Sequence, residues 1–126
     1  MQRYKVTLTT STGQASTGYL PDPSSNDASV GITGKIKSII YTNTNFVSSS
    51  DVTITTERNG QTVWTQSNIG TSSLVKHPRA QYHTTAGAAC TGVAEKTEIC
   101  VVNDRIKIVV AQGGSVKTAS FEVIVE

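Results

Sequence analysis

Leucine, charged residues and aromatic residues are all scarce in this sequence. Of its 126 residues, only three are Leu, 20 are charged and seven are aromatic, and the formal net charge is +2. So few Leu residues argue against a helical bundle, and no apolar run has the length of a membrane span. A nucleic-acid interface usually shows a basic stripe or stacking aromatic side chains on one face, and neither is evident here. We therefore expect neither nucleic acid nor a membrane as a partner.

Signals for secretion and for catalysis are also missing. A strand pattern begins by Tyr4, without the apolar segment of a signal peptide, so we expect synthesis and folding in a cytoplasm. There is no Gly-x-Ser-x-Gly elbow, no carboxylate pair suited to acid–base chemistry and no glycine-rich loop before a helix. The sequence therefore predicts a protein that is not an enzyme and carries no cofactor.

The two cysteines, Cys90 and Cys100, leave several interpretations open. In a reducing compartment they are expected to be free thiols that pack as small hydrophobic residues. A disulfide requires the two segments to lie side by side, which their spacing does not establish. A zinc site formed with His77 and His83 has suitable ligand types but lacks the short ligand pairs of known zinc motifs, so we predict no metal.

Abundant β-branched residues define the expected fold. Val, Ile and Thr together account for 43 residues, a bias typical of strands with one buried face. Apolar and polar residues alternate over 4–10, 105–111 and 118–126, and further strands are expected over 29–33, 35–42, 52–58, 61–66 and 98–102. We predict a single domain, residues 1–126, that folds as an all-β antiparallel β-sandwich of seven or eight strands, jelly-roll-like or Ig-like.

Several local features are predicted within this sandwich. The polar stretch 11–18 and the proline-containing stretch 21–27 are expected to be connections. The apolar pattern changes phase between Ile36 and Ile39, which indicates a β-bulge or a strand covered on both faces. Asn59-Gly60 is expected to form a type I′ hairpin turn. Residues 67–98 form an irregular excursion, with short strands expected near 74–75 and 80–84.

The most unusual residues of the excursion are His77, Pro78, Arg79 and Tyr82. One interpretation is a loop that Pro78 fixes and in which Arg79 pairs with a carboxylate or a carbonyl group. The other is a protein-contact site, because Arg, Tyr and His on a stiff loop are residue types enriched at interface cores. The loops at 43–51 and 21–27 are further candidate contacts, or are simply solvated.

The C-terminal part resembles small virion proteins of tailed bacteriophages, the decoration or cement proteins of the capsid. The resemblance covers mainly residues 76–126 and rests on Pro78-Arg79, on the run from Thr85 to Ala89, on Asn103-Asp104-Arg105-Ile106-Lys107-Ile108-Val109-Val110-Ala111-Gln112-Gly113-Gly114, and on Thr118 to Val123. Members often carry aromatic residues before the Pro-Arg pair, where this chain has Lys76 and His77.

The resemblance implies a β-sandwich on the capsid exterior of a virion, made in the cytoplasm of a host bacterium. Its partners would be the major capsid protein and further copies of itself, as a homodimer or homotrimer, and Pro78 and Arg79 would be contact residues. Another virion component, such as a tail-tube, head-closure or fibre-associated protein, is the main alternative. A carbohydrate-binding sandwich, with Trp64 and Tyr82 as stacking residues, is a further one.

Overall fold

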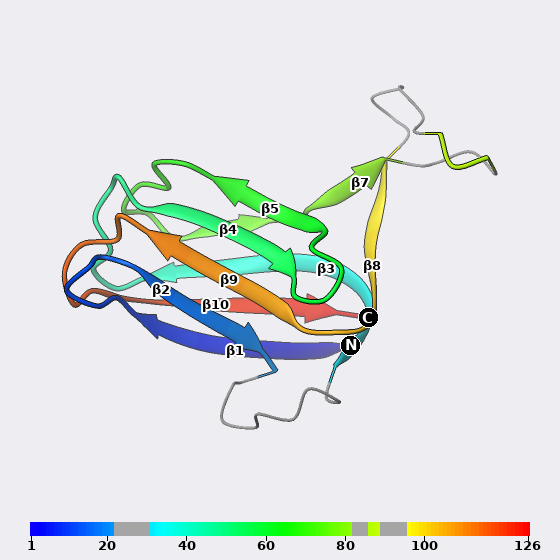
Figure 1. Cartoon of the computed structure of the whole chain (residues 1–126), viewed down its shortest axis with the longest axis horizontal. Helices are drawn as coiled ribbons and strands as arrows, with labels where there is room; N and C mark the ends of the chain where they lie inside the picture. The colour runs from blue at the N-terminus through cyan, green and yellow to red at the C-terminus, as the bar shows by residue number, and fades with distance from the viewer. Residues whose placement is uncertain (22–30, 82–85, 89–95) are drawn as a thin grey trace.

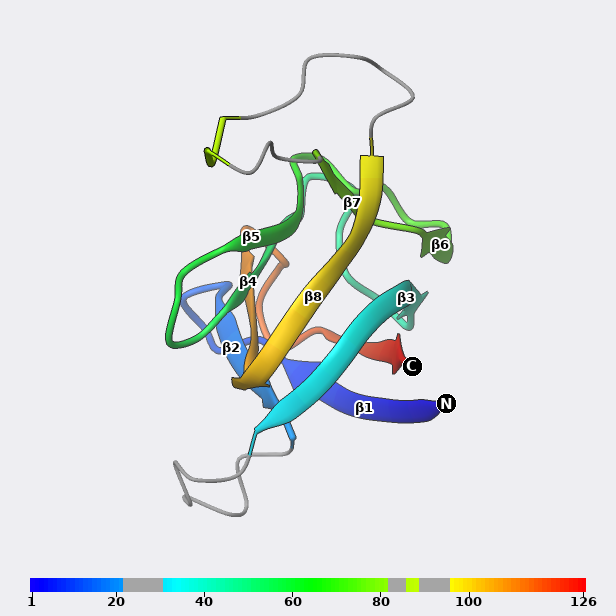
Figure 2. The same cartoon turned by 90° about the vertical axis from the view of Figure 1, so that its right-hand side faces the viewer.

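The computed structural model shows two antiparallel β-sheets packed face to face (Figures 1 and 2). It describes residues 1–21, 31–81, 86–88 and 96–126, and these residues form ten strands. The six-stranded sheet has the order β1 (Gln2–Thr9), β10 (Thr118–Val125), β3 (Ile32–Asn43), β8 (Lys96–Asp104) and β7 (Arg79–Gln81), and β6 (Leu74–Lys76) also pairs with β3. The four-stranded sheet has the order β2 (Ser16–Leu20), β9 (Ile106–Ala111), β4 (Asp51–Thr56) and β5 (Thr62–Gln66). The predicted antiparallel β-sandwich is confirmed, but seven or eight strands was too low a count.

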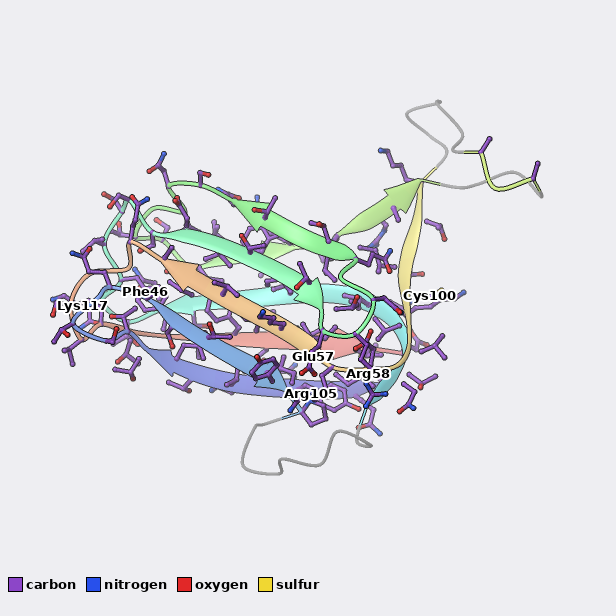
Figure 3. The ribbon with its side chains drawn as sticks, viewed as in Figure 1. Phe46, Glu57, Arg58, Cys100, Arg105 and Lys117 are labelled. Carbon is purple, nitrogen blue, oxygen red and sulfur yellow. The ribbon has the colours of Figure 1, made fainter. Side chains whose placement is uncertain are left out.

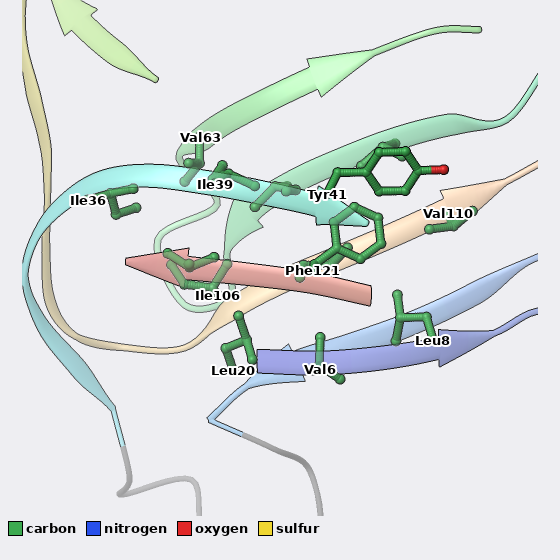
Figure 4. Close-up of a cluster of buried hydrophobic side chains, with 14 of the residues drawn as sticks. Val6, Leu8, Leu20, Ile36, Ile39, Tyr41, Val63, Ile106, Val110 and Phe121 are labelled. Atoms are coloured by element: carbon green, nitrogen blue, oxygen red, sulfur yellow. The ribbon is translucent and has the colours of Figure 1, made fainter. Parts of the chain in front are cut away.

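Alternating side chains from both sheets form the core (Figure 4). Along β9 and β10, every second side chain is buried, and the side chains between them are partly exposed. The buried ones are Ile106, Ile108 and Val110 on β9, and Ala119, Phe121, Val123 and Val125 on β10. This is the period-two pattern that the sequence predicts for these two strands.

A β-bulge at Lys37 divides β3 into two parts. On β10, the consecutive residues Ile124 and Val125 pair with Ser38 and Ile36, so Lys37 has no partner in this ladder. The phase change noted between residues 36 and 39 is thus a bulge. On its other edge, β3 pairs with β8 over residues 32–36 and with β6 over residues 39–41. Lys37 therefore lies where this edge passes from one partner strand to the next.

Two places where no strand was expected, residues 16–18 and Gly34, belong to strands in the structure. β2 begins at Ser16, inside the polar stretch that we expected to be a connection. Its Gly18 packs so closely on β1 that a Cβ atom there would lie 2.3 Å from Leu8 Cδ2, so this glycine reflects packing rather than a turn. β3 likewise continues through Gly34, where a strand was expected to end, and a Cβ atom at Gly34 would lie 2.6 Å from Val125 Cγ1.

The connection between β4 and β5 is a longer loop than the predicted type I′ turn. It spans residues 57–61, and of Asn59 and Gly60 only Gly60 has a positive φ. The buried carboxylate of Asp104, at the end of β8, accepts hydrogen bonds from the backbone N–H groups of Arg58 (2.8 Å) and Asn59 (3.2 Å). This contact comes from a distant part of the chain, so the local sequence does not reveal it.

The excursion contains the two short strands that were expected, as far as the structure describes it. β6 contains residues 74–75, and β7 begins just before Ala80, whereas residues 82–84 lie outside the described residues. β7 pairs with residues 96–98 of β8, and together they project beyond the end of the sandwich (Figure 1). We call residues 79–81 and 96–98 the arm.

Tyr41 carries a buried hydroxyl group that has no hydrogen-bond partner among the described residues. Burial raises the pKa of Tyr41 to about 12. Because an unpaired buried hydroxyl is costly, we expect Tyr41→Phe to raise the free energy of unfolding by about 1 kcal/mol at pH 7. The gain should increase above pH 10, where Tyr41 ionises in the unfolded chain but not in the folded protein. Urea denaturation at pH 7 and pH 10.5 measures both effects, and a less stable variant would contradict them.

Candidate functional site

The predicted contact residues His77, Pro78 and Arg79 lie between β6 and β7, at the base of the arm. Pro78 is buried, whereas His77 and Arg79 are exposed. Nη1 of Arg79 donates to the carbonyl oxygens of Pro78 (2.8 Å) and Lys37 (3.5 Å), and Nδ1 of His77 lies 3.3 Å from the same Lys37 oxygen. Arg79 therefore pairs with backbone carbonyl groups, as expected for a loop that Pro78 fixes. Contact of these residues with another protein stays a prediction. Tyr82 lies outside the described residues.

A cluster of charges holds the base of the arm against β3. Lys37 Nζ lies 2.8 Å from Glu98 Oε2 and 3.3 Å from Glu126 Oε2. Glu98 is also the partner of Arg79 in the β7–β8 ladder. The hydrogen bond between Lys37 and Glu98 raises the pKa of Lys37 and lowers the pKa of Glu98. The bulged residue of β3 is thus the anchor of the arm, through its side chain and through its carbonyl group.

Acid should loosen this anchor. Because the pKa of Glu98 is lowered on folding, its stabilising effect is present above its ordinary pKa of 4.5 and is lost as the pH falls through the folded-state pKa. The pKa of Lys37 is raised, so its effect persists until the pH exceeds 10.5. We expect Glu98→Gln to increase amide exchange in the arm several-fold at pH 7, whereas Glu122→Gln, which removes the Arg3 pair on β1, should not. Equal exchange in both variants would show that Glu98 does not anchor the arm.

Four loops meet at the opposite end of the sandwich, and we call them the loop platform: residues 11–15, 43–50, 67–73 and 112–117. Hydrogen bonds join these loops into one network. They run from Gly70 N to Ser48 O (3.1 Å), from Asn43 Nδ2 to Thr71 O (2.9 Å), from Val47 N to Gly113 O (3.4 Å) and from Gly113 N to Gln14 O (2.9 Å). The buried Thr10 adds a further bond, from its hydroxyl to Gly114 O (2.6 Å). Such cross-linking makes a surface that needs little ordering before it binds.

The loop platform is almost without charge. Lys117 is the only charged residue in its four loops, and Ser, Thr, Asn and Gly make up most of the rest. Val47 and Val116 are exposed on it. Val116 also has a φ of +51°, which is unusual for a β-branched residue and costs conformational energy. Depletion of charge and a strained, exposed apolar residue are both features of binding surfaces rather than of solvated loops.

The arm end of the molecule is charged by comparison (Figure 3). Arg105 forms a two-point ion pair with Glu57, in which its Nη2 lies 2.7 Å from Oε1, and its guanidinium group lies 4.5 Å from the ring centroid of Tyr19. The sequence predicted neither this cluster nor the loop platform as a whole. Of the loops that form the platform, only 43–51 was named as a candidate contact, because the other three join it only in the folded chain.

The remaining candidates are only partly within the described residues. Cys100 is a free thiol, as expected, but it is exposed on β8 rather than packed as a small hydrophobic residue. Its possible partners Cys90 and His83 lie outside the described ranges, and within those ranges no three metal-ligating side chains gather. Trp64, the carbohydrate-stacking candidate, is half-buried against the core. No helix in the described part is long and apolar enough to cross a membrane.

No protein-family model matches this chain, and no curated protein matches its sequence. Its class is therefore defined by its fold, a two-sheet antiparallel β-sandwich.

Proposed function

We propose that the protein is a structural, non-enzymatic component of a tailed-bacteriophage virion: a decoration or cement protein that binds the exterior of the capsid. Its partners are the major capsid protein and further copies of itself. One observation carries the proposal. The run from Asn103 to Gly114 that resembles such proteins forms the end of β8, all of β9 and the start of the turn 112–117, and this turn is part of the loop platform, whose four loops carry only one charged residue.

The loop platform suits contact with a capsid shell. Interface cores are depleted in charged residues, and a preorganised surface loses little conformational entropy on binding. A shell presents many identical sites close together, so bound copies that also contact their neighbours attach more strongly than single copies do. The charged base of the arm, with His77, Pro78 and Arg79, lies at the other end of the sandwich and is free to meet neighbouring molecules.

Cosedimentation with capsids that lack the protein tests this function. We expect saturable binding at micromolar concentration, with a fixed number of copies per capsid. No binding at this concentration, together with a monomer in light scattering, would overturn the proposal. Formation of rings or tubes by the purified protein would instead favour a tail component.

A further inference from the structure

The outer edge of β1 is the longest free strand edge in the described part of the chain. β1 pairs with β10 over eight consecutive residues without a register shift. Within the described residues, no strand pairs with its other edge. The edge strands β2 and β5 have five residues each, and β6 has three. A long, regular edge exposes a row of unpaired N–H and C=O groups, which natural proteins usually shorten, interrupt or cover.

A groove runs along this edge, between β1 and β2. It is lined by residues 5–9 of β1 and 16–18 of β2. The β2 side is built from Ser16, Thr17 and Gly18, whose short side chains leave the groove open, although Gly18 itself packs on Leu8. The two strands belong to different sheets and do not pair with each other. The groove is thus a site where an extended strand could hydrogen-bond to β1.

We propose that the occupant is β1 of a second copy of the chain, paired antiparallel about a two-fold axis at Val6. Along β1, Arg3, Lys5, Thr7 and Thr9 lie on the exposed face, and Tyr4, Val6 and Leu8 lie on the inner face. In an antiparallel pair, two directly opposed residues lie on the same face of the sheet. An inner-face residue of one copy must therefore oppose an inner-face residue of the other, and this requires that one residue of β1 lie opposite its own copy, at the two-fold axis.

The charge pattern selects Val6 as that position. With the axis at Lys5, the two Lys5 side chains would oppose each other, which is destabilising. With the axis at Thr7, Arg3 would extend past the end of the partner strand. With the axis at Val6, Lys5 meets Thr7 of the second copy, Arg3 meets Thr9, and Tyr4 meets Leu8. Glu122 offsets part of this positive charge, since it lies 3.0 Å from Arg3 and 3.8 Å from Lys5.

The pairing goes beyond the proposed function and describes the free protein, because antiparallel β1 strands point the two loop platforms of a pair in opposite directions. It needs no capsid and is tested without one. In a Cys90→Ser, Cys100→Ser background, Lys5→Cys and Thr7→Cys proteins are oxidised separately and as an equimolar mixture. Because a disulfide requires Cα atoms within about 7 Å, only the mixture should cross-link efficiently, at least fivefold more than either protein alone. Equal yields, or self-cross-linking of the Thr7→Cys protein, would overturn this pairing.

Light scattering provides an independent measurement on the protein without cysteine substitutions. We expect a dimer of the 13.3 kDa chain. Thr7→Lys places two like charges opposite each other and should raise the dimer dissociation constant at least tenfold. The matched control, Thr53→Lys, changes an exposed Thr on β4 and should not. A monomeric parent protein, or equal weakening by both changes, would overturn the proposal. A dimer that does not bind capsids would leave the pairing intact and would reject only the capsid function.

Discussion

Replacing Asp104 by Ala is expected to lower the free energy of unfolding by about 3 kcal/mol. Asp104 is 1% exposed, and its carboxylate accepts hydrogen bonds from the backbone N–H groups of Arg58, Asn59 and Arg105. Alanine would leave these donors without their partner and would release the loop at 57–61. For a domain of this size, the loss corresponds to a fall in Tm of roughly 10 °C, which calorimetry measures.

Two variants separate this effect from a general effect of losing a carboxylate. Asp104→Asn keeps one acceptor oxygen and should cost only about 1 kcal/mol. Asp51→Ala removes a partly buried carboxylate that, among the described residues, accepts one bond, from Asn68 N at 3.0 Å, and should also cost about 1 kcal/mol. If Asp104→Ala is no more harmful than Asp51→Ala, then Asp104 does not organise the loop.

The double change Val47→Asp, Val116→Asp should weaken capsid binding about a hundredfold, which equals roughly 2.7 kcal/mol at 25 °C. Both side chains are exposed on the loop platform, and the changes introduce two charges into a surface that has one. Asp accepts the positive φ of position 116 better than Val does, so folding should be preserved. Quantitative cosedimentation gives the affinity, and the Tm of the variant checks its folding.

The matched controls make the same chemical change elsewhere. Val102, on β8, is 72% exposed, compared with 59% for Val116, and Val75 is exposed on β6. We expect Val75→Asp and Val102→Asp to bind capsids within twofold of the parent protein. Weakening of all these variants by a similar factor would mean that added negative charge, and not the loop platform, determines binding.

The core strands could be predicted because their information is local. Alternation along β9 and β10 places every second side chain in the core, and the phase change between Ile36 and Ile39 indicated a bulge as one of two alternatives. β2 escaped prediction because its glycine is required by contact with Leu8 of another strand. The Asn59-Gly60 turn was misassigned because Asp104 holds the loop from 45 residues away in sequence.

The two candidate surfaces, the base of the arm and the loop platform, also differ in whether neighbouring residues in the sequence define them. His77, Pro78 and Arg79 are unusual as neighbours in sequence, so the sequence alone singled them out as candidate contacts. The loop platform joins four loops of ordinary Ser, Thr and Asn residues, and its lack of charge becomes a property of one surface only after the strands place the loops together.

A cryo-EM reconstruction of capsids decorated with the purified protein tests the central claim most directly. The loop platform should contact the shell through loops 43–50 and 112–117, with the arm pointing away from the shell. Capsids without added density, or a shell contact made by the arm end with the loop platform in solvent, would contradict the proposed role.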